Sequence, residues 1–302
     1  MGKVAFVFSG QGAQYSGMGK SLYEHSAAAK NVFDTAESIR PGTKNQCFSG
    51  TLEEISITKN TQPCLFCVDL AAAEALREAG ITPDMTAGFS LGEVAAVTFA
   101  GIFTTEEGFS LVTKRGEAMQ AAAEQADSAM AAVLKLPNEK VEELCRMHQS
   151  VFPVNYNCPG QLVIAGEKAA LAEAIENCKA AGARRALPLA VSGAFHTPLM
   201  AKAAAELRAY VADFTFSAPK MDIYSNLDGK VYDCSDLPAH LEQHMISPVR
   251  WTQLVKNGMA AGLTSACEIG PGKTLTGFAG KISKELTCKT VQDMAGVEAA
   301  CH

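Results

Sequence analysis

The chain has 302 residues, and its 26 Lys and Arg against 32 Asp and Glu give a formal net charge of −6. Hydrophobic residues make up 48% and charged residues 19% of the chain, which excludes intrinsic disorder, because disordered chains combine low hydrophobicity with high charge. The acidic balance without a basic stripe argues against nucleic-acid binding, and no apolar run approaches the ~18 residues that predict a membrane span. A chain of this length is expected to form one large domain with an insertion, or two domains.

Strand-like and helical segments alternate through the first and last parts of the chain. The first part predicts strands over 3–8 and 85–89 and helices over 21–38, 62–79, 91–100 and 105–126. The last part predicts helices over 198–212, 238–244 and 251–262, strands over 222–225 and 266–269, and a last helix after residue 272. This alternation is typical of a mostly parallel sheet with helices on both faces.

The segment 128–191 has a pattern of its own. It predicts strands over 130–136, 151–157, 161–165 and 183–191, with helices over 138–149 and 168–181. The order β-α-β-β-α-β is ferredoxin-like. We therefore expect an inserted ferredoxin-like small subdomain at 128–191, and a catalytic domain formed by 1–127 and 192–302.

Ten cysteines are spread along the chain without the spacing of a disulfide framework. Cys64 and Cys67 form a C-x-x-C motif inside an apolar run, whereas a redox pair needs partial exposure and nearby positive charge. The sequence therefore predicts buried free thiols and a cytoplasmic location.

The most informative motif is Gly88-Phe89-Ser90-Leu91-Gly92, which stands between a predicted strand and a predicted helix. A serine on such a turn is exposed as a nucleophile, and this arrangement is that of α/β-hydrolases. The sequence thus predicts an α/β-hydrolase-like large domain with Ser90 as nucleophile. The amide of Leu91 is placed to stabilise an oxyanion, and the glycine loop after the first strand can offer a second amide, that of Gln11.

A serine nucleophile needs a base, and His196 is the best placed of the six histidines, because it lies in a loop that follows a predicted strand. No aspartate occupies the usual hydrolase position between Ser90 and His196, so a backbone carbonyl is expected to orient the imidazole. His240 and His244 have the spacing H-x-x-x-H, but no third ligand is evident and we expect a surface pair rather than a metal site.

Two further features are ambiguous from the residues alone. The segments 10–15 and 270–274 resemble nucleotide-binding loops, but each departs from the required glycine pattern. Arg115 lies in the middle of a predicted helix, where an exposed arginine is favoured over a clamp for a substrate carboxylate.

Taken together, the motifs closely resemble the family of malonyl-CoA:acyl carrier protein transacylases of fatty acid synthesis, over essentially the whole chain. The segments that carry this resemblance are 6–12, 61–63, 88–92, 114–116, 157–161, 193–196, 248–251 and 268–273.

The resemblance implies a ping-pong acyl transfer from malonyl-CoA to the phosphopantetheine thiol of an acyl carrier protein, without a metal or another cofactor. Ser90 would carry the malonyl group and His196 would act as general base. Arg115 would bind the malonyl carboxylate, and Gln62, Met119 and Phe195 would also contact the substrate. A monomer is expected.

Three residues depart from the family pattern. Phe89 replaces a histidine before the nucleophile, and Ser9 replaces the more common proline of the first motif. The residue whose main-chain carbonyl orients the histidine corresponds to Arg250, where Gln or Asn is more common.

The carrier protein implied by the resemblance is acidic, so docking needs a local basic patch. Two clusters are candidates: Lys179, Arg184 and Arg185 on the insertion, and Lys281, Lys284 and Lys289 on the last predicted helix. Alternative functions are a serine thioesterase, a stand-alone acyltransferase for a polyketide synthase, and a non-catalytic docking module.

Overall fold

A parallel five-stranded sheet forms the centre of the larger subdomain in the computed structural model, which describes residues 2–301. In spatial order its strands are β7 (Asp222–Tyr224), β2 (Met85–Gly88), β1 (Lys3–Phe8), β8 (Leu263–Ile269) and β9 (Thr287–Val291). Because all five strands are parallel, their carboxyl ends lie at one edge of the sheet, where α/β folds bind ligands.

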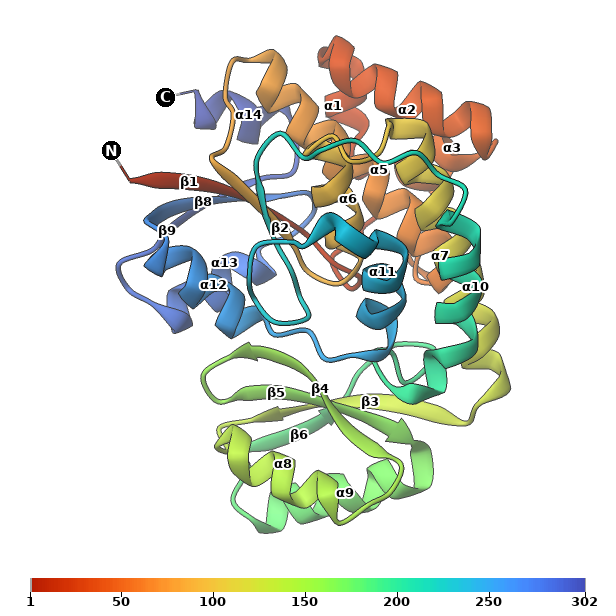
Figure 1. Ribbon diagram of the computed structural model, residues 1–302, viewed down its shortest axis with the longest axis vertical. Helices are drawn as coiled ribbons and strands as arrows, with labels where there is room; N and C mark the ends of the chain where they lie inside the picture. The colour runs from red at the N-terminus through yellow and green to blue at the C-terminus, as the bar shows by residue number, and fades with distance from the viewer. Residues whose placement is uncertain (1, 302) are drawn as a thin grey trace.

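Helices cover both faces of this sheet (Figure 1). Phe6 and Phe8 of β1 belong to the core beneath α5 (Thr58–Glu78), α6 (Leu91–Phe99) and α7 (Thr105–Gln125). Ala5 and Val7 point to the other face, where α12 (Trp251–Ala260) and α13 (Thr274–Ile282) pack. The predicted α/β class with a parallel sheet is confirmed.

Further helices complete the larger subdomain around these layers. They are α1 (Lys20–His25), α2 (Ala27–Ile39), α3 (Thr43–Ser49), α4 (Leu52–Ile55), α10 (Ala201–Val211), α11 (Leu237–Ile246), α14 (Met294–Ala300) and the 3₁₀ turns η1 (Pro198–Met200) and η2 (Cys234–Asp236).

The smaller subdomain forms a separate lobe on the side of the molecule away from both termini (Figure 1). Its antiparallel sheet has the order β4 (Val151–Cys158), β5 (Gln161–Glu167), β3 (Ser128–Leu134) and β6 (Arg185–Pro188). Helices α8 (Asn138–Arg146) and α9 (Lys168–Ala180) pack against it. This strand order is that of a ferredoxin-like fold.

Several element bounds differ from those predicted. The helix predicted over 21–38 is two helices, because Ser26 has an extended backbone and its hydroxyl caps α2 by accepting from the Ala29 amide. Helices α3 and α4 were not predicted. The helix after residue 272 is not the last element, since β9 and α14 follow it, so Lys284 and Lys289 lie beyond α13.

The strand predicted over 183–191 is shorter in the structure. β6 ends at Pro188, and one further hydrogen bond, from the Leu189 amide to the Met130 carbonyl at 2.9 Å, follows it before the chain leaves the sheet. The segment that leaves the sheet here carries Leu189 and Val191 to the cavity described below, next to Phe195 and His196.

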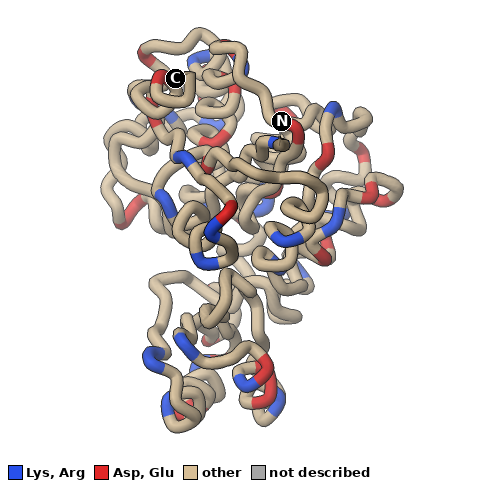
Figure 2. Tube along the Cα trace, turned by 90° about the vertical axis from the view of Figure 1, so that its left-hand side faces the viewer, with Lys and Arg blue, Asp and Glu red and all other residues tan. Residues whose placement is uncertain are grey.

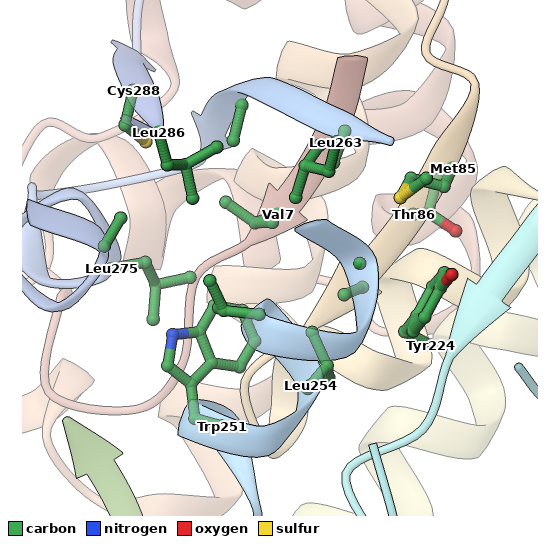
Figure 3. Close-up of a pocket in the computed structure, with 16 residues that line it drawn as sticks. Val7, Met85, Thr86, Tyr224, Trp251, Leu254, Leu263, Leu275, Leu286 and Cys288 are labelled. Carbon is green, nitrogen blue, oxygen red and sulfur yellow. The ribbon is translucent and has the colours of Figure 1, made fainter. Parts of the chain in front are cut away.

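One small cavity lies inside the core, on the α12 side of the sheet (Figure 3). Its volume is about 20 Å³, and side chains such as Val7, Leu254, Leu263 and Trp251 line it. A space of this size holds about one water molecule, so it is a packing defect rather than a substrate site. Among residues 2–301, no helix is both long and apolar enough to cross a membrane.

Candidate active site

Ser90 lies on the sharp turn between β2 and α6 with φ 53° and ψ −104°, outside the regions that L-residues prefer. The turn depends on its two glycines. A Cβ on Gly88 would collide with the main chain of Gly92, and a Cβ on Gly92 would collide with the carbonyls of Phe8 and Ser9. A strained residue of this kind costs about 1–3 kcal/mol and persists only where its surroundings fix it.

His196 lies in the loop between β6 and η1, and its Nε2 is 2.7 Å from Ser90 Oγ. Its Nδ1 lies 3.0 Å from the carbonyl of His244 and 3.1 Å from that of Ser247. Carbonyls only accept hydrogen bonds, so Nδ1 carries the hydrogen and Nε2 is free to accept the serine proton. Burial, with further contributions from His244 and Arg115, lowers the pKa of His196 to about 3. The imidazole is therefore neutral at physiological pH.

The assignment of Arg250 as the histidine-orienting residue is wrong. The acceptor is a backbone carbonyl as expected, but His244 and Ser247 provide it, because the last carbonyls of α11 have no partner within the helix. Arg250 is exposed, and its guanidinium lies 5.6 Å from the ring centre of Tyr156.

Arg115 is 1% exposed on α7, so the exposed position favoured by the residues alone is wrong. Its Nη1 donates to Gln62 Oε1 at 2.7 Å, and its Nη2 donates to Ser90 Oγ at 3.3 Å. Burial lowers the pKa of Arg115 to about 10, with Glu93 acting in the opposite direction, so the guanidinium stays charged at neutral pH. Gly116 permits this placement, since a Cβ there would press on Thr58 and Gln62 of α5.

The structure brings eight of the nine predicted site residues to one cavity of about 90 Å³. They are Gln11, Gln62, Ser90, Leu91, Arg115, Met119, Phe195 and His196. Met119 Sδ also accepts from Gln62 Nε2 at 3.2 Å. Within residues 2–301 the amides of Gln11 and Leu91 have no hydrogen-bond acceptor, which leaves both available to an oxyanion.

The smaller subdomain completes the cavity with residues that sequence reasoning missed: Met130, Asn155, Leu189 and Val191. A second cavity of about 240 Å³ adjoins it, because Gln11, Phe89, Asn155 and Leu189 line both. A groove of about 700 Å³ also reaches the site, where His196 lines it. The serine is therefore accessible along the junction between the subdomains.

Two departures from the family pattern have clear structural settings. The ring of Phe89 packs 5.6 Å from that of Trp251 and 6.2 Å from that of Phe278, between ring centres. The hydroxyl of Ser9 donates to Asp69 Oδ1 at 2.8 Å in the buried core, a bond that proline could not make.

The expected surface pair of histidines is wrong for His244, which is buried and faces the carboxylate of Glu93 with Nδ1 3.7 Å from Oε1. His240 Nε2 lies 3.4 Å from the same oxygen. Among residues 2–301, no three His, Cys, Asp or Glu side chains gather as a metal site. Glu93 and the neighbouring Asn226 were not predicted, although Asn226 follows a sheet strand at its carboxyl end, where such residues are expected.

Comparisons with known proteins agree with this geometry. The model of the acyl transferase domain family matches residues 5–298. The malonyl CoA-acyl carrier protein transacylase of Bacillus subtilis is 39% identical over 99% of this chain and 96% of its own length. The enzyme of the same name from Escherichia coli is 37% identical over 99% of both chains.

Two solved structures have the same fold. The malonyl-transacylase solved in complex with a type II PKS acyl-carrier protein superposes with a TM-score of 0.95 at 36% identity, over 99% of both chains. The corresponding enzyme from Streptococcus pneumoniae gives a TM-score of 0.95 at 37% identity, also over 99% of both chains. The strained serine paired with a neutral histidine, the matched family model and the full-length relatives lead to one conclusion: this chain is an acyltransferase that belongs to the malonyl CoA-acyl carrier protein transacylase family.

Proposed function

We propose that the chain transfers the malonyl group from malonyl-CoA to the phosphopantetheine thiol of an acyl carrier protein, through a malonyl ester on Ser90. One observation carries the proposal: the Oγ of Ser90 lies 2.7 Å from the base Nε2 of His196 and 3.3 Å from the buried cation of Arg115. A reactive serine is thus placed beside a group that binds a carboxylate.

In the first half-reaction, Nε2 of His196 takes the Oγ proton as Oγ attacks the thioester carbonyl. The negative oxygen of the tetrahedral intermediate receives hydrogen bonds from the amides of Gln11 and Leu91. When the carbon–sulfur bond breaks, the imidazolium returns its proton to the sulfur. The products are malonyl-Ser90 and free CoA.

The second half-reaction runs the same steps with the carrier protein. The pantetheine thiol gives its proton to Nε2 of His196 and its sulfur attacks the ester carbonyl. The carbon–oxygen bond then breaks and Oγ of Ser90 regains the proton. The thioester supplies the activation, so we propose that the reaction needs no metal or other cofactor.

Arg115 provides selectivity for malonyl over acetyl. Its Nε has no hydrogen-bond partner among residues 2–301, and its Nη2 has only the reactive serine hydroxyl. A malonyl carboxylate satisfies this buried cation, whereas an acetyl group leaves it unpaired in a desolvated site. The same cation makes the site unfavourable for an alkyl chain, which argues against a fatty-acyl thioesterase.

We propose that the carrier protein docks beside the 240 Å³ cavity that adjoins the site. Gln161 lines both the 240 Å³ cavity and a neighbouring pocket whose basic residues are Lys135, Arg184, Arg185 and Lys281. The pocket brings two residues of the first predicted basic cluster together with one residue of the second, across the subdomain junction. Basic and acidic residues alternate along much of the chain in the view of Figure 2, whereas the charged residues that line this pocket are all basic, which suits a phosphate or an acidic helix.

Charge reversal tests the docking proposal. The double variant Arg185→Glu with Lys281→Glu should raise the KM for carrier protein at least tenfold. The control Lys179→Glu alters an exposed lysine on the same subdomain that pairs with Glu176 outside the pocket, and its KM should stay within twofold. An unchanged KM in the double variant would rule out this docking site.

We further propose a cytoplasmic location, which the free, mostly buried cysteines support.

Intact-protein mass spectrometry tests the transfer itself. Brief mixing with malonyl-CoA should add one malonyl group to the wild-type chain and none to Ser90→Ala. Carrier protein should then remove that group and become malonylated. If water removes it at the same rate without carrier protein, the chain is a thioesterase, and normal transfer by Ser90→Ala would indicate a non-catalytic docking module.

A further inference from the structure

The strained turn at Ser90 is bridged by one side chain, that of Asn226, which lies two residues beyond the end of β7. Its Oδ1 accepts from the Ser90 amide at 2.8 Å, and its Nδ2 donates to the Gly88 carbonyl at 2.6 Å. The amide group therefore bonds the main chain on both sides of the turn. Since Asn226 is completely buried, no water competes for these two bonds.

Asn226 is in turn held by a carboxylate. Its own amide donates to Glu93 Oε2 at 2.7 Å, and Glu93 is completely buried in the first turn of α6. The other oxygen, Oε1, accepts from the hydroxyl of Tyr232 at 2.9 Å. Burial opposes the charge of Glu93, but the facing histidines His244 and His240 and the Asn226 amide lower its pKa to about 2. The carboxylate is therefore ionised at neutral pH.

The same carboxylate also reaches the catalytic base. The ring of His244 faces Glu93, and the carbonyl of His244 accepts from Nδ1 of His196 at 3.0 Å. The rings of His196 and His244 are 5.5 Å apart between centres. One buried carboxylate is thus connected to the nucleophile through Asn226 and to the base through His244.

We infer that Glu93 is a positioning residue that fixes Ser90 and His196 relative to each other, acting through Asn226 and His244. In serine–histidine–acid triads the carboxylate contacts the imidazole directly. Here carbonyls contact the imidazole, and the carboxylate holds the two segments that present the nucleophile and the base. Displacement of a reacting group by about 1 Å can cost 100-fold in rate, so loss of this connection should appear in the chemical step.

Two size-conserving variants test the inference, which rests on the proposed acyl transfer. Glu93→Gln removes the charge, and Asn226→Asp removes the donor to the Gly88 carbonyl while keeping an acceptor for the Ser90 amide. Each should slow single-turnover acylation of Ser90 by malonyl-CoA about 10- to 100-fold, with the KM for malonyl-CoA within about threefold of wild type. Glu93→Ala should be slower than Glu93→Gln, because the glutamine keeps one acceptor oxygen, for either the Tyr232 hydroxyl or the Asn226 amide, whereas alanine keeps neither.

The matched control is Glu78→Gln, which alters a remote carboxylate that accepts from Ser26 Oγ and should leave the acylation rate unchanged. A fluorophosphonate probe, which reacts with an activated serine and needs no malonyl group, separates the two proposals. If the wild type reacts with the probe and not with malonyl-CoA, the substrate assignment fails, whereas the effect of Glu93→Gln on probe labelling still tests the positioning. Folded Glu93→Gln and Asn226→Asp variants that label and acylate at the wild-type rate would overturn the inference.

Discussion

Two buried charges flank Ser90, and they differ in how completely the protein satisfies them. Glu93 receives hydrogen bonds from the Asn226 amide and the Tyr232 hydroxyl and has two histidines beside it. Arg115 has one protein partner apart from the serine, Gln62, and its Nε has none among residues 2–301. A buried charge without enough partners is costly unless a ligand supplies them.

This difference distinguishes a charge that holds the protein's own segments from a charge that can bind a substrate. Both carboxylate oxygens of Glu93 already have hydrogen-bond donors within the protein, so its charge holds the protein's own segments. The guanidinium of Arg115 lines the cavity and retains unused donors, so its charge is available to a substrate carboxylate. The number of hydrogen-bonding partners that each charge has within the protein thus distinguishes the two roles better than burial does, because both residues are almost fully buried.

Both charges act on the Ser90–His196 pair, so loss of the base should have the largest effect. His196→Ala should lower kcat for malonyl transfer about 10²–10⁴-fold, the range that a positioned general base contributes. Steady-state kinetics with malonyl-CoA and carrier protein measure this loss, with a substitution of the exposed His25 at the end of α1, His25→Ala, as the control. A loss below tenfold would mean that another group removes the serine proton.

Removing the charge of Arg115 should change the selectivity for malonyl-CoA over acetyl-CoA. Arg115→Ala should lower kcat/KM for malonyl-CoA about 10²–10³-fold, because a buried charge pair that loses one member costs about 3–4 kcal/mol. The value for acetyl-CoA should stay the same or rise, since the cation no longer stands unpaired. Competition between the two thioesters, followed by mass of the Ser90 adduct, measures the ratio.

Arg208→Ala is the matched control, because Arg208 is half-exposed and pairs with Glu242 away from the site. Arg115→Lys should recover only part of the selectivity, since a lysine lacks the planar fork that binds both carboxylate oxygens. Equal losses for malonyl and acetyl in Arg115→Ala would contradict the clamp.

The pairing of Ser90 with His196 could be predicted because the signals of both residues are local. A strand, two glycines around Ser90 and a helix define the elbow within a few residues, and His196 follows a strand in the same way. The sheet class follows from the alternation of strands and helices. Elements such as β9 were missed because its mostly exposed residues lack a clear apolar pattern.

The burial of the charged residues could not be predicted, because it depends on contacts between distant segments. The close packing of α5 at Gly116 contributes to the burial of Arg115, and the bond between Ser9 and Asp69 joins residues 60 positions apart. In a sequence, Glu93 is indistinguishable from an ordinary acidic residue in the first turn of a helix. The carbonyls that orient His196 leave no side-chain signal at all.

The electrostatic setting also predicts an unusual pH profile. The pKa of His196 is lowered to about 3 by burial, His244 and Arg115, so the free enzyme should keep its neutral base well below the usual histidine range. An unshifted histidine near 6.5 would lose about thirtyfold in kcat/KM between pH 8 and pH 5. We expect less than a twofold loss over this range, measured as the Ser90 acylation rate at low malonyl-CoA. An acidic limb near pH 6.5 would contradict the assigned environment.

The smallest effect concerns a third buried ionisable residue, Asp69, which has one side-chain partner, the hydroxyl of Ser9, and an Oδ2 without a partner among residues 2–301. Burial raises the pKa of Asp69 well above its usual value, opposed by the Ser9 bond and reinforced by Glu268. A raised pKa in the folded state means that this carboxyl contributes most to stability below its unfolded pKa, and loses that contribution as pH rises through the folded value. Asp69→Asn cannot ionise, so its thermal midpoint should equal that of wild type near pH 4 and exceed it by about 2 °C or more at pH 9. The opposite order at pH 9 would show that Asp69 is stabilised as a carboxylate, and that it belongs with Glu93 among the satisfied charges.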